Sequence, residues 1–307
     1  MAEHTNRRRF IAVTGSTAAA ALAGCLGGDG DGESTDMDDG NGMDDGMTET
    51  PGMDGGMTET PGMDDDTMSG PVTVTVRIEN VAPTDYYDSM TSTEGAIWIT
   101  PGAYAVHTGE NPIYTEGEAA SIGLEALAEA GPPTGFEGEP GLVDELQGME
   151  MGVQSAGAYT PENTVADPND PTGEVPGAPP IAPGGAFEFD VEVEPGQKLS
   201  FASMFVPSND LFFSPEPAGI PLWPEDGEPV EGDVTDHVEL WDAGTEPNAE
   251  PPGQGPDQAP AQDSPTQGDD EMANVRRVGD MMDTYDYPAV ADAIQVTVTP
   301  HEMMDGS

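Results

Sequence analysis

The stretch from Ala186 to Val193 reads AFEFDVEV, with an apolar side chain at every second position and carboxylates between them. Successive side chains of a strand point to opposite faces, so this spacing gives one apolar face and one acidic face. The same alternation runs through Val72–Glu79 and Ile294–Thr299. These stretches therefore predict antiparallel strands with one face on a core and one face in solvent.

Other stretches extend this pattern into a domain. Further strands are predicted at 96–100, 103–107, 199–206 and 238–241. The turn residues Pro195 and Gly196 predict that 186–193 and 199–206 are joined as antiparallel partners. We therefore expect an antiparallel β-sandwich over residues 71–300, with seven or eight short strands.

Two short helices and two long acidic loops complete the expected domain. Ser121–Ala130 has a capping serine at its start and Gly131 as its stop, and Leu142–Met149 is a second, shorter helical stretch. Residues 157–184 and 247–272 are rich in proline and polar residues, which predicts loops.

The N-terminus has the pattern of an export signal. Arg7, Arg8 and Arg9 precede an apolar stretch that ends at Leu22, which is shorter than the ~20 residues of a membrane-spanning helix. The paired Arg7 and Arg8 resemble a twin-arginine signal, and Leu22-Ala23-Gly24-Cys25 resembles a lipobox. We predict a signal peptide over 1–24 and a lipid on Cys25 that anchors the protein at the extracellular face of the cell membrane. The alternative is a signal peptide that is simply removed or that stays as the anchor.

Residues 25–70 are predicted to be a disordered tether. The segment Gly46–Asp54 recurs as Gly56–Asp64, and glycine, aspartate, threonine and proline dominate, so little surface can be buried. Methionines recur from Met37 to Met68, and their thioethers are ligands for Cu(I), although methionine is also an ordinary linker residue. Residues 301–307 are predicted to be a disordered tail.

Charge and cysteine content exclude several classes of function. The chain has 60 acidic residues against 7 lysines and arginines, a formal charge of −53, so nucleic acid is excluded as a partner. High salt screens such self-repulsion, and we interpret the composition as salt adaptation rather than as an acidic disordered chain. Because Cys25 is the single cysteine, we expect no intramolecular disulfide and no catalytic thiol.

Two segments resemble a known family. Residues 202–213 read ASMFVPSNDLFF and residues 240–246 read LWDAGTE. They resemble the spondin N-terminal domain family, in particular its prokaryotic, haloarchaeal-type lipoprotein members. The stretches 107–131 and 287–300 are similar to further parts of that family, so the resemblance covers most of 72–300. It implies a sandwich shaped like a C2 domain and, by analogy with the animal members of the family, a calcium ion among the loops at one end.

The resemblance places the calcium-binding carboxylates on Asp210, Asp242 and Glu246. The chemistry suits Ca²⁺, which prefers six to eight oxygen ligands, and Gly244 lets the backbone bend between the last two acids. Glu246 stands where animal members have an aspartate. The alternative is that Asp210 and Asp242 only close turns.

No catalytic constellation is evident in the sequence. His107, His237 and His301 have no metal-ligand spacing, and Ser208 lacks the context of a nucleophile. We therefore expect no enzyme activity, but a calcium-binding adhesion or binding module for a cell-envelope or matrix polymer or protein. The alternative is an exported hydrolase or a copper-handling envelope protein. The sequence indicates no oligomeric state.

Overall fold

A computed structural model describes residues 70–87, 91, 93–149, 151–166, 180–249 and 269–301. These residues belong to one compact unit, Gly70–Ser307. The predicted signal peptide with Arg7 and Arg8, the lipidation site Cys25 and the tether up to residue 69 lie outside the described residues. Within the described part of the chain, no helix has the length and apolar character needed to cross a membrane.

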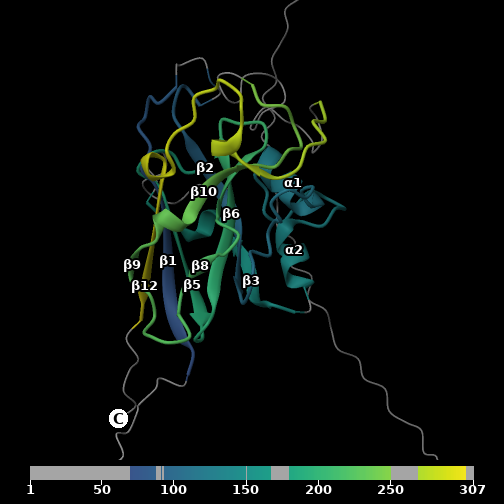
Figure 1. Cartoon of the computed structure of the whole chain (residues 1–307). Helices are drawn as coiled ribbons and strands as arrows, with labels where there is room; N and C mark the ends of the chain where they lie inside the picture. The colour runs from purple at the N-terminus through teal and green to yellow at the C-terminus, as the bar shows by residue number, and fades with distance from the viewer. Residues whose placement is uncertain are drawn as a thin grey trace, which may run out of the picture. The chain divides into compact units, whose positions relative to one another are not determined.

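The described strands form two antiparallel sheets, so the predicted mainly β sandwich is confirmed (Figure 1). The five-stranded sheet has the order β4 (Thr164–Ala166), β5 (Ala186–Val193), β1 (Val72–Asn80), β12 (Ile294–Pro300) and β9 (Gly232–Asp233). The seven-stranded sheet has the order β11 (Arg276–Arg277), β10 (Val238–Asp242), β7 (Leu211–Pro215), β6 (Lys198–Val206), β2 (Trp98–His107) and β3 (Val153–Tyr159), with β8 (Ile220–Pro221) paired to β6.

The alternating strands behave as their sequences predict. In β1 every second residue is buried, and in β5 Asp190 and Glu192 are exposed between buried apolar residues. β1 lies between β5 and β12, so that Val76 pairs with a residue of each neighbour, Phe189 and Val298. The apolar faces of these three strands turn toward the other sheet, where the Phe189 ring stacks on the rings of two tyrosines of β2 and β3. The centroid distances are 4.7 Å to Tyr104 and 5.0 Å to Tyr159.

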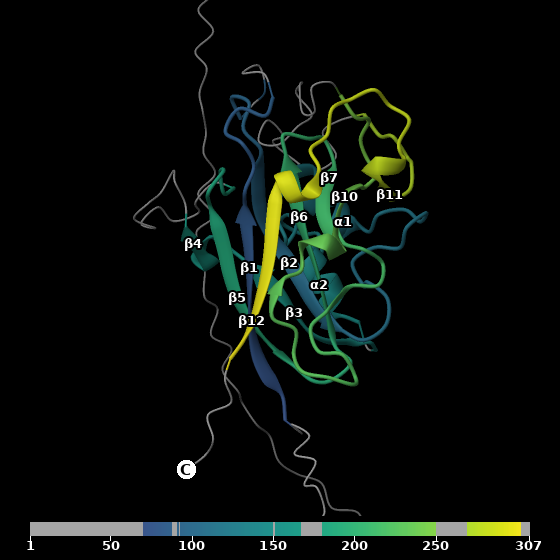
Figure 2. The same cartoon turned by 60° about the vertical axis from the view of Figure 1, so that its left-hand side comes forward.

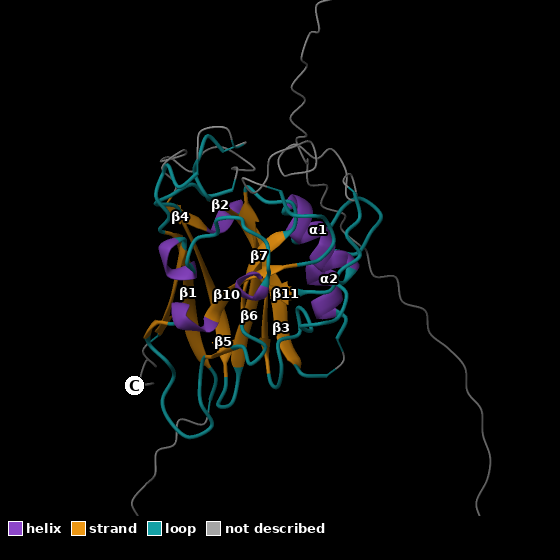
Figure 3. Cartoon of the chain, turned by 45° about the horizontal axis from the view of Figure 1, so that its top comes forward, coloured by secondary structure: helices purple, strands orange, loops and turns teal. Residues whose placement is uncertain are grey.

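The seven-stranded sheet is covered on both faces. Tyr104 of β2 faces the five-stranded sheet, whereas Ala103 and Ala105 pack in a core cluster with both α-helices. The helices α1 (Ile122–Ala130) and α2 (Leu142–Gln147) lie beside this sheet (Figure 3). Burial on two faces explains why β6 is buried at every position after Lys198 and lacks a simple alternation.

Both predicted helices are present, although α2 ends at Gln147 rather than at Met149. The Ser121 side chain accepts a hydrogen bond from the Leu124 N–H at 3.2 Å, and Gly131 ends α1 with a φ of 91°. In the described ranges, short 3₁₀ turns lie at Pro161–Asn163, Thr235–His237, Val278–Asp280 and Val290–Asp292.

Several local predictions were wrong. The stretches 186–193 and 199–206 do not form a hairpin, because β5 belongs to one sheet and β6 to the other, and the turn between them crosses the sandwich (Figure 2). The two strands predicted around Pro101 are one strand, β2, whose register with β6 shifts between Ile99 and Gly102. The predicted loop 157–184 begins inside β3 and contains β4.

Candidate metal centre

Strand pairing brings two of the predicted carboxylates together. Asp210 directly precedes β7, and Asp242 is the last residue of β10. β7 and β10 are antiparallel neighbours in which Leu211 lies opposite Asp242. The residue before one strand and the last residue of its partner therefore meet at the same end of the sheet.

The Asp210 carboxylate is fully buried and only half satisfied. Its Oδ2 accepts the backbone N–H groups of Thr245 and Glu246, at 2.8 and 3.1 Å, and the Thr245 hydroxyl at 3.4 Å. Its Oδ1 is buried without a hydrogen-bond partner among the described residues. A buried carboxylate oxygen normally has a donor, a water molecule or a cation beside it, so this oxygen is open to any of the three.

Asp242 is enclosed by the turn that follows it. Its Oδ1 accepts the Gly244 N–H at 2.8 Å, and its Oδ2 accepts the side-chain amide of Asn248 and Nη2 of Arg276, the latter at 3.2 Å. Gly244 has a φ of 73°, and a Cβ there would come within 2.9 Å of backbone atoms of Ala273 and Asn274. The turn therefore requires glycine both for its conformation and for its close approach to residues 273–274.

Glu271 supplies a third carboxylate that the sequence did not predict. Oxygens of Asp210, Asp242 and Glu271 all lie within 4.8 Å of one another. The Glu271 N–H donates to the Thr245 carbonyl at 2.8 Å, which holds this segment against the turn after β10. Sequence reasoning placed Glu271 in the low-complexity loop 247–272. The sequence feature that could have pointed to Glu271 is the pair Arg276–Arg277 shortly after it. Two adjacent positive charges in a very acidic chain indicate that carboxylates gather nearby.

Glu246, the third predicted ligand, does not belong to this group of three carboxylates. It is 2% exposed and its backbone N–H donates to Asp210, but its carboxylate is not one of the three that gather within 4.8 Å. The structure therefore brings together Asp210 and Asp242 of the predicted set, with Glu271 beside them. No histidine of the described residues belongs to such a group.

The negative charges of these neighbouring carboxylates repel one another. Burial raises the pKa of the Asp210 carboxyl well above its usual range, and the neighbouring Asp242 charge raises it further. Burial also raises the pKa of Asp242, although the Arg276 charge acts in the opposite direction. An added cation would therefore stabilise the ionised forms of these carboxylates.

The donor set fits a hard divalent ion. All three side chains offer carboxylate oxygens, and the Asp210 Oδ1 that lacks a partner among the described residues belongs to one of them. Calcium prefers such oxygens and accepts irregular geometry, so Asp210, Asp242 and Glu271 would hold it with backbone oxygens or water.

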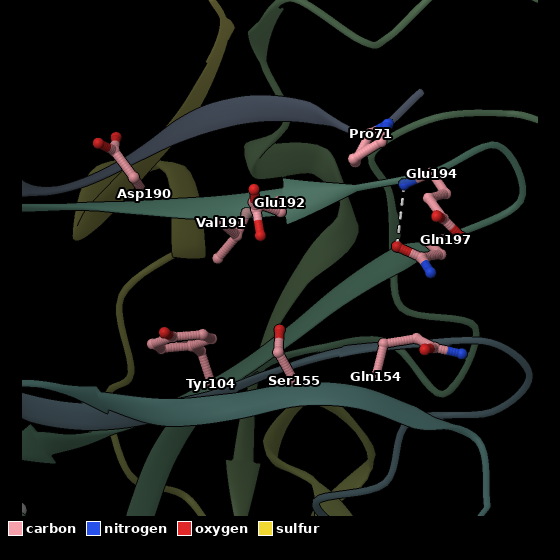
Figure 4. Close-up of a pocket in the computed structure, with 9 residues that line it drawn as sticks. All are labelled: Pro71, Tyr104, Gln154, Ser155, Asp190, Val191, Glu192, Glu194 and Gln197. Carbon is pink, nitrogen blue, oxygen red and sulfur yellow. Dashed lines mark hydrogen bonds between the residues drawn. The ribbon is translucent and has the colours of Figure 1, made fainter. Parts of the chain in front are cut away.

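A separate cavity of about 400 Å³ lies between the two sheets. In Figure 4, Tyr104 and Ser155 stand on one side of it and Glu192 on the other. Its rim includes Gln197, whose Oε1 accepts the Glu194 N–H at 3.0 Å. Gln197 precedes β6 and Asp210 follows it, so this rim and the carboxylate group lie toward opposite ends of that strand.

No protein-family model and no curated protein matches the chain. The spondin resemblance therefore stays a prediction from the motifs at 202–213 and 240–246.

We predict that Asp210→Asn stabilises the ion-free protein at neutral pH. The amide has the size of the carboxylate but no charge to bury, so the free energy of unfolding should rise by roughly 1 kcal/mol or more. Thermal unfolding with a chelator present measures this. Asp236→Asn, which removes the same charge from an exposed residue, is the matched control. A lower melting temperature for Asp210→Asn than for the wild type would show that the buried anion is stabilising.

Proposed function

We propose that this chain is a lipid-anchored, extracellular binding or adhesion module of the spondin-domain type, stabilised by calcium and without catalytic activity. The observation that carries the calcium part is the buried Asp210 carboxylate, which lies within 4.8 Å of oxygens of Asp242 and Glu271. Its Oδ1 has no hydrogen-bond partner in the described part of the chain. Bound cations commonly neutralise such a concentration of buried negative charge.

The positions of the three carboxylates indicate which parts of the chain a bound ion would connect. Asp210 belongs to the turn between β6 and β7, Asp242 to the end of β10, and Glu271 to the segment before β11. An ion that binds all three fixes three loops that are distant in sequence at one end of the sandwich. Loops positioned by a rigid sheet are common binding surfaces, so we propose that this end meets the envelope or matrix partner.

The anchor rests on the N-terminal sequence. Arg7 and Arg8 would direct export, and a lipid on Cys25 would hold the protein at the outer face of the membrane. The acidic, lysine-poor composition supports a salt-rich setting, in which screening lowers self-repulsion.

Calcium should bind the full chain at one saturable, stabilising site. Titration calorimetry of chelator-treated protein in about 1 M KCl, where exposed carboxylates are strongly screened, should give a binding heat. At a calcium concentration of 100 times Kd, the free energy of unfolding should rise by about 2.7 kcal/mol. Asp242→Asn should lose both effects and Asp236→Asn should keep them. Equal responses from these two variants, or no response from the wild type, would refute calcium binding at this site.

Cys25→Ser should release the protein from the membrane. Cell fractionation should find the wild type in the membrane fraction until detergent is added, and the variant in the soluble or medium fraction. Replacing Arg7 and Arg8 with lysine should instead leave the uncleaved precursor inside the cell. A Cys25→Ser protein that stays in the membrane fraction would favour the apolar stretch before Leu22 as the anchor.

A further inference from the structure

Arg276 places one nitrogen among the carboxylates of the candidate metal centre. Its Nη2 lies 2.8 and 2.9 Å from the two Glu271 oxygens and 3.2 Å from Asp242 Oδ2. A guanidinium nitrogen of this kind has two hydrogens, so three acceptors share two donors. The nitrogen is therefore held by the concentrated negative charge rather than by a matched set of hydrogen bonds.

A second nitrogen of the guanidinium, Nε, is poorly matched to its surroundings. The Nε of Arg276 is buried and has no hydrogen-bond partner among the described residues. The side chain as a whole is 36% exposed, whereas that of Asp242 is fully buried. The guanidinium thus has a route to solvent, and leaving the site would relieve its unsatisfied Nε.

A bound cation and this guanidinium need the same oxygens. Calcium binds carboxylate oxygens at about 2.3–2.6 Å, so an ion on Asp242 and Glu271 would replace the contacts that Nη2 makes with them. Two cations so close together in a partly buried site repel each other strongly. This repulsion disfavours a site that holds both cations at once.

We propose that Arg276 is an internal counter-ion that occupies Asp242 and Glu271 when no metal is bound, and that a divalent cation binds by displacing it. This inference rests on the proposed calcium site and adds to it the residue that sets its affinity. With all three carboxylates ionised, the single guanidinium leaves a net negative charge in the ion-free site. Arg276 stabilises that state and so weakens ion binding.

The backbone of Arg276 stays in place during the exchange. Arg276 pairs with Asp242 in the ladder between β11 and β10, which lie side by side in Figure 2. Only the side chain has to rotate. The displaced guanidinium then lies elsewhere at the ion-binding end of the sandwich. Its new position changes the distribution of charge on the surface that a partner would contact.

The adjacent Arg277 provides a matched control. It belongs to the same short strand and forms ion pairs with Glu239 at 2.9 Å and Glu216 at 3.4 Å, away from the three site carboxylates. Arg276→Gln and Arg277→Gln remove the same charge from neighbouring positions. The loss of one positive charge changes the long-range attraction for calcium almost equally in the two variants. A difference between their calcium affinities therefore reports direct competition between the Arg276 side chain and the ion.

The test is calorimetric titration of calcium into the full-length wild type and both variants, with melting temperatures in chelator. Arg276→Gln should bind calcium about tenfold more tightly or better, and Arg277→Gln should stay within about threefold of the wild type. Ion-free Arg276→Gln should also melt at a lower temperature, because its carboxylates lose their counter-charge. Tighter binding together with a less stable ion-free state is not expected of a residue that only supports the fold.

Other outcomes separate this inference from the proposed function. Wild-type binding with unchanged or weaker binding by Arg276→Gln would overturn the competition and leave the calcium site standing. No binding by any of the three proteins would overturn both. If Arg276→Gln does not fold, Arg276→Lys, which keeps the charge on a shorter reach, should bind calcium more tightly than the wild type, and weaker binding would refute the proposal.

Discussion

The buried carboxylate of Asp210 is the interaction on which one end of the molecule depends. Its Oδ2 receives two backbone N–H groups from the turn after β10, so it ties that turn to the turn before β7. Its Oδ1 lies in the interior without a donor from the described residues. The same side chain thus orders two loops and leaves an uncompensated negative charge beside Asp242 and Glu271. A cation beside Oδ1 would compensate this charge and leave the hydrogen bonds to Oδ2 in place.

The strands around this carboxylate are closely packed. The seven-stranded sheet is covered by the other sheet on one face and by α1 and α2 on the opposite face, so β6, β7 and β10 are almost entirely buried. Strands fixed in this way keep Asp210 and Asp242 together even though like charges repel. Arg276 then supplies partial neutralisation from the short edge strand β11.

Half-buried strands could be predicted from the sequence, and fully buried ones less well. β1, β5 and β12 have one solvent-facing side, so alternation reveals both their location and their inward residues. β7 and β3 were not predicted: LFFSP is buried at all five positions, and VQSAGAY contains small residues that allow close packing but show no period. A local sequence also does not show which strand pairs with which. The turn at Pro195-Gly196 is compatible both with a hairpin and with a crossing from one sheet to the other, and the hairpin prediction was therefore wrong. Asp210 and Asp242 were found through motifs, whereas Glu271 required knowledge of which distant loop returns to β10.

The most direct test of the central claim is a crystal structure of the protein grown with calcium. A cation within about 2.3–2.6 Å of oxygens of Asp210, Asp242 and Glu271, with Arg276 turned away from them, is the predicted result. Arg276 Nη2 still in contact with Asp242 and Glu271 at a saturating calcium concentration, with no ion beside Asp210, would contradict it.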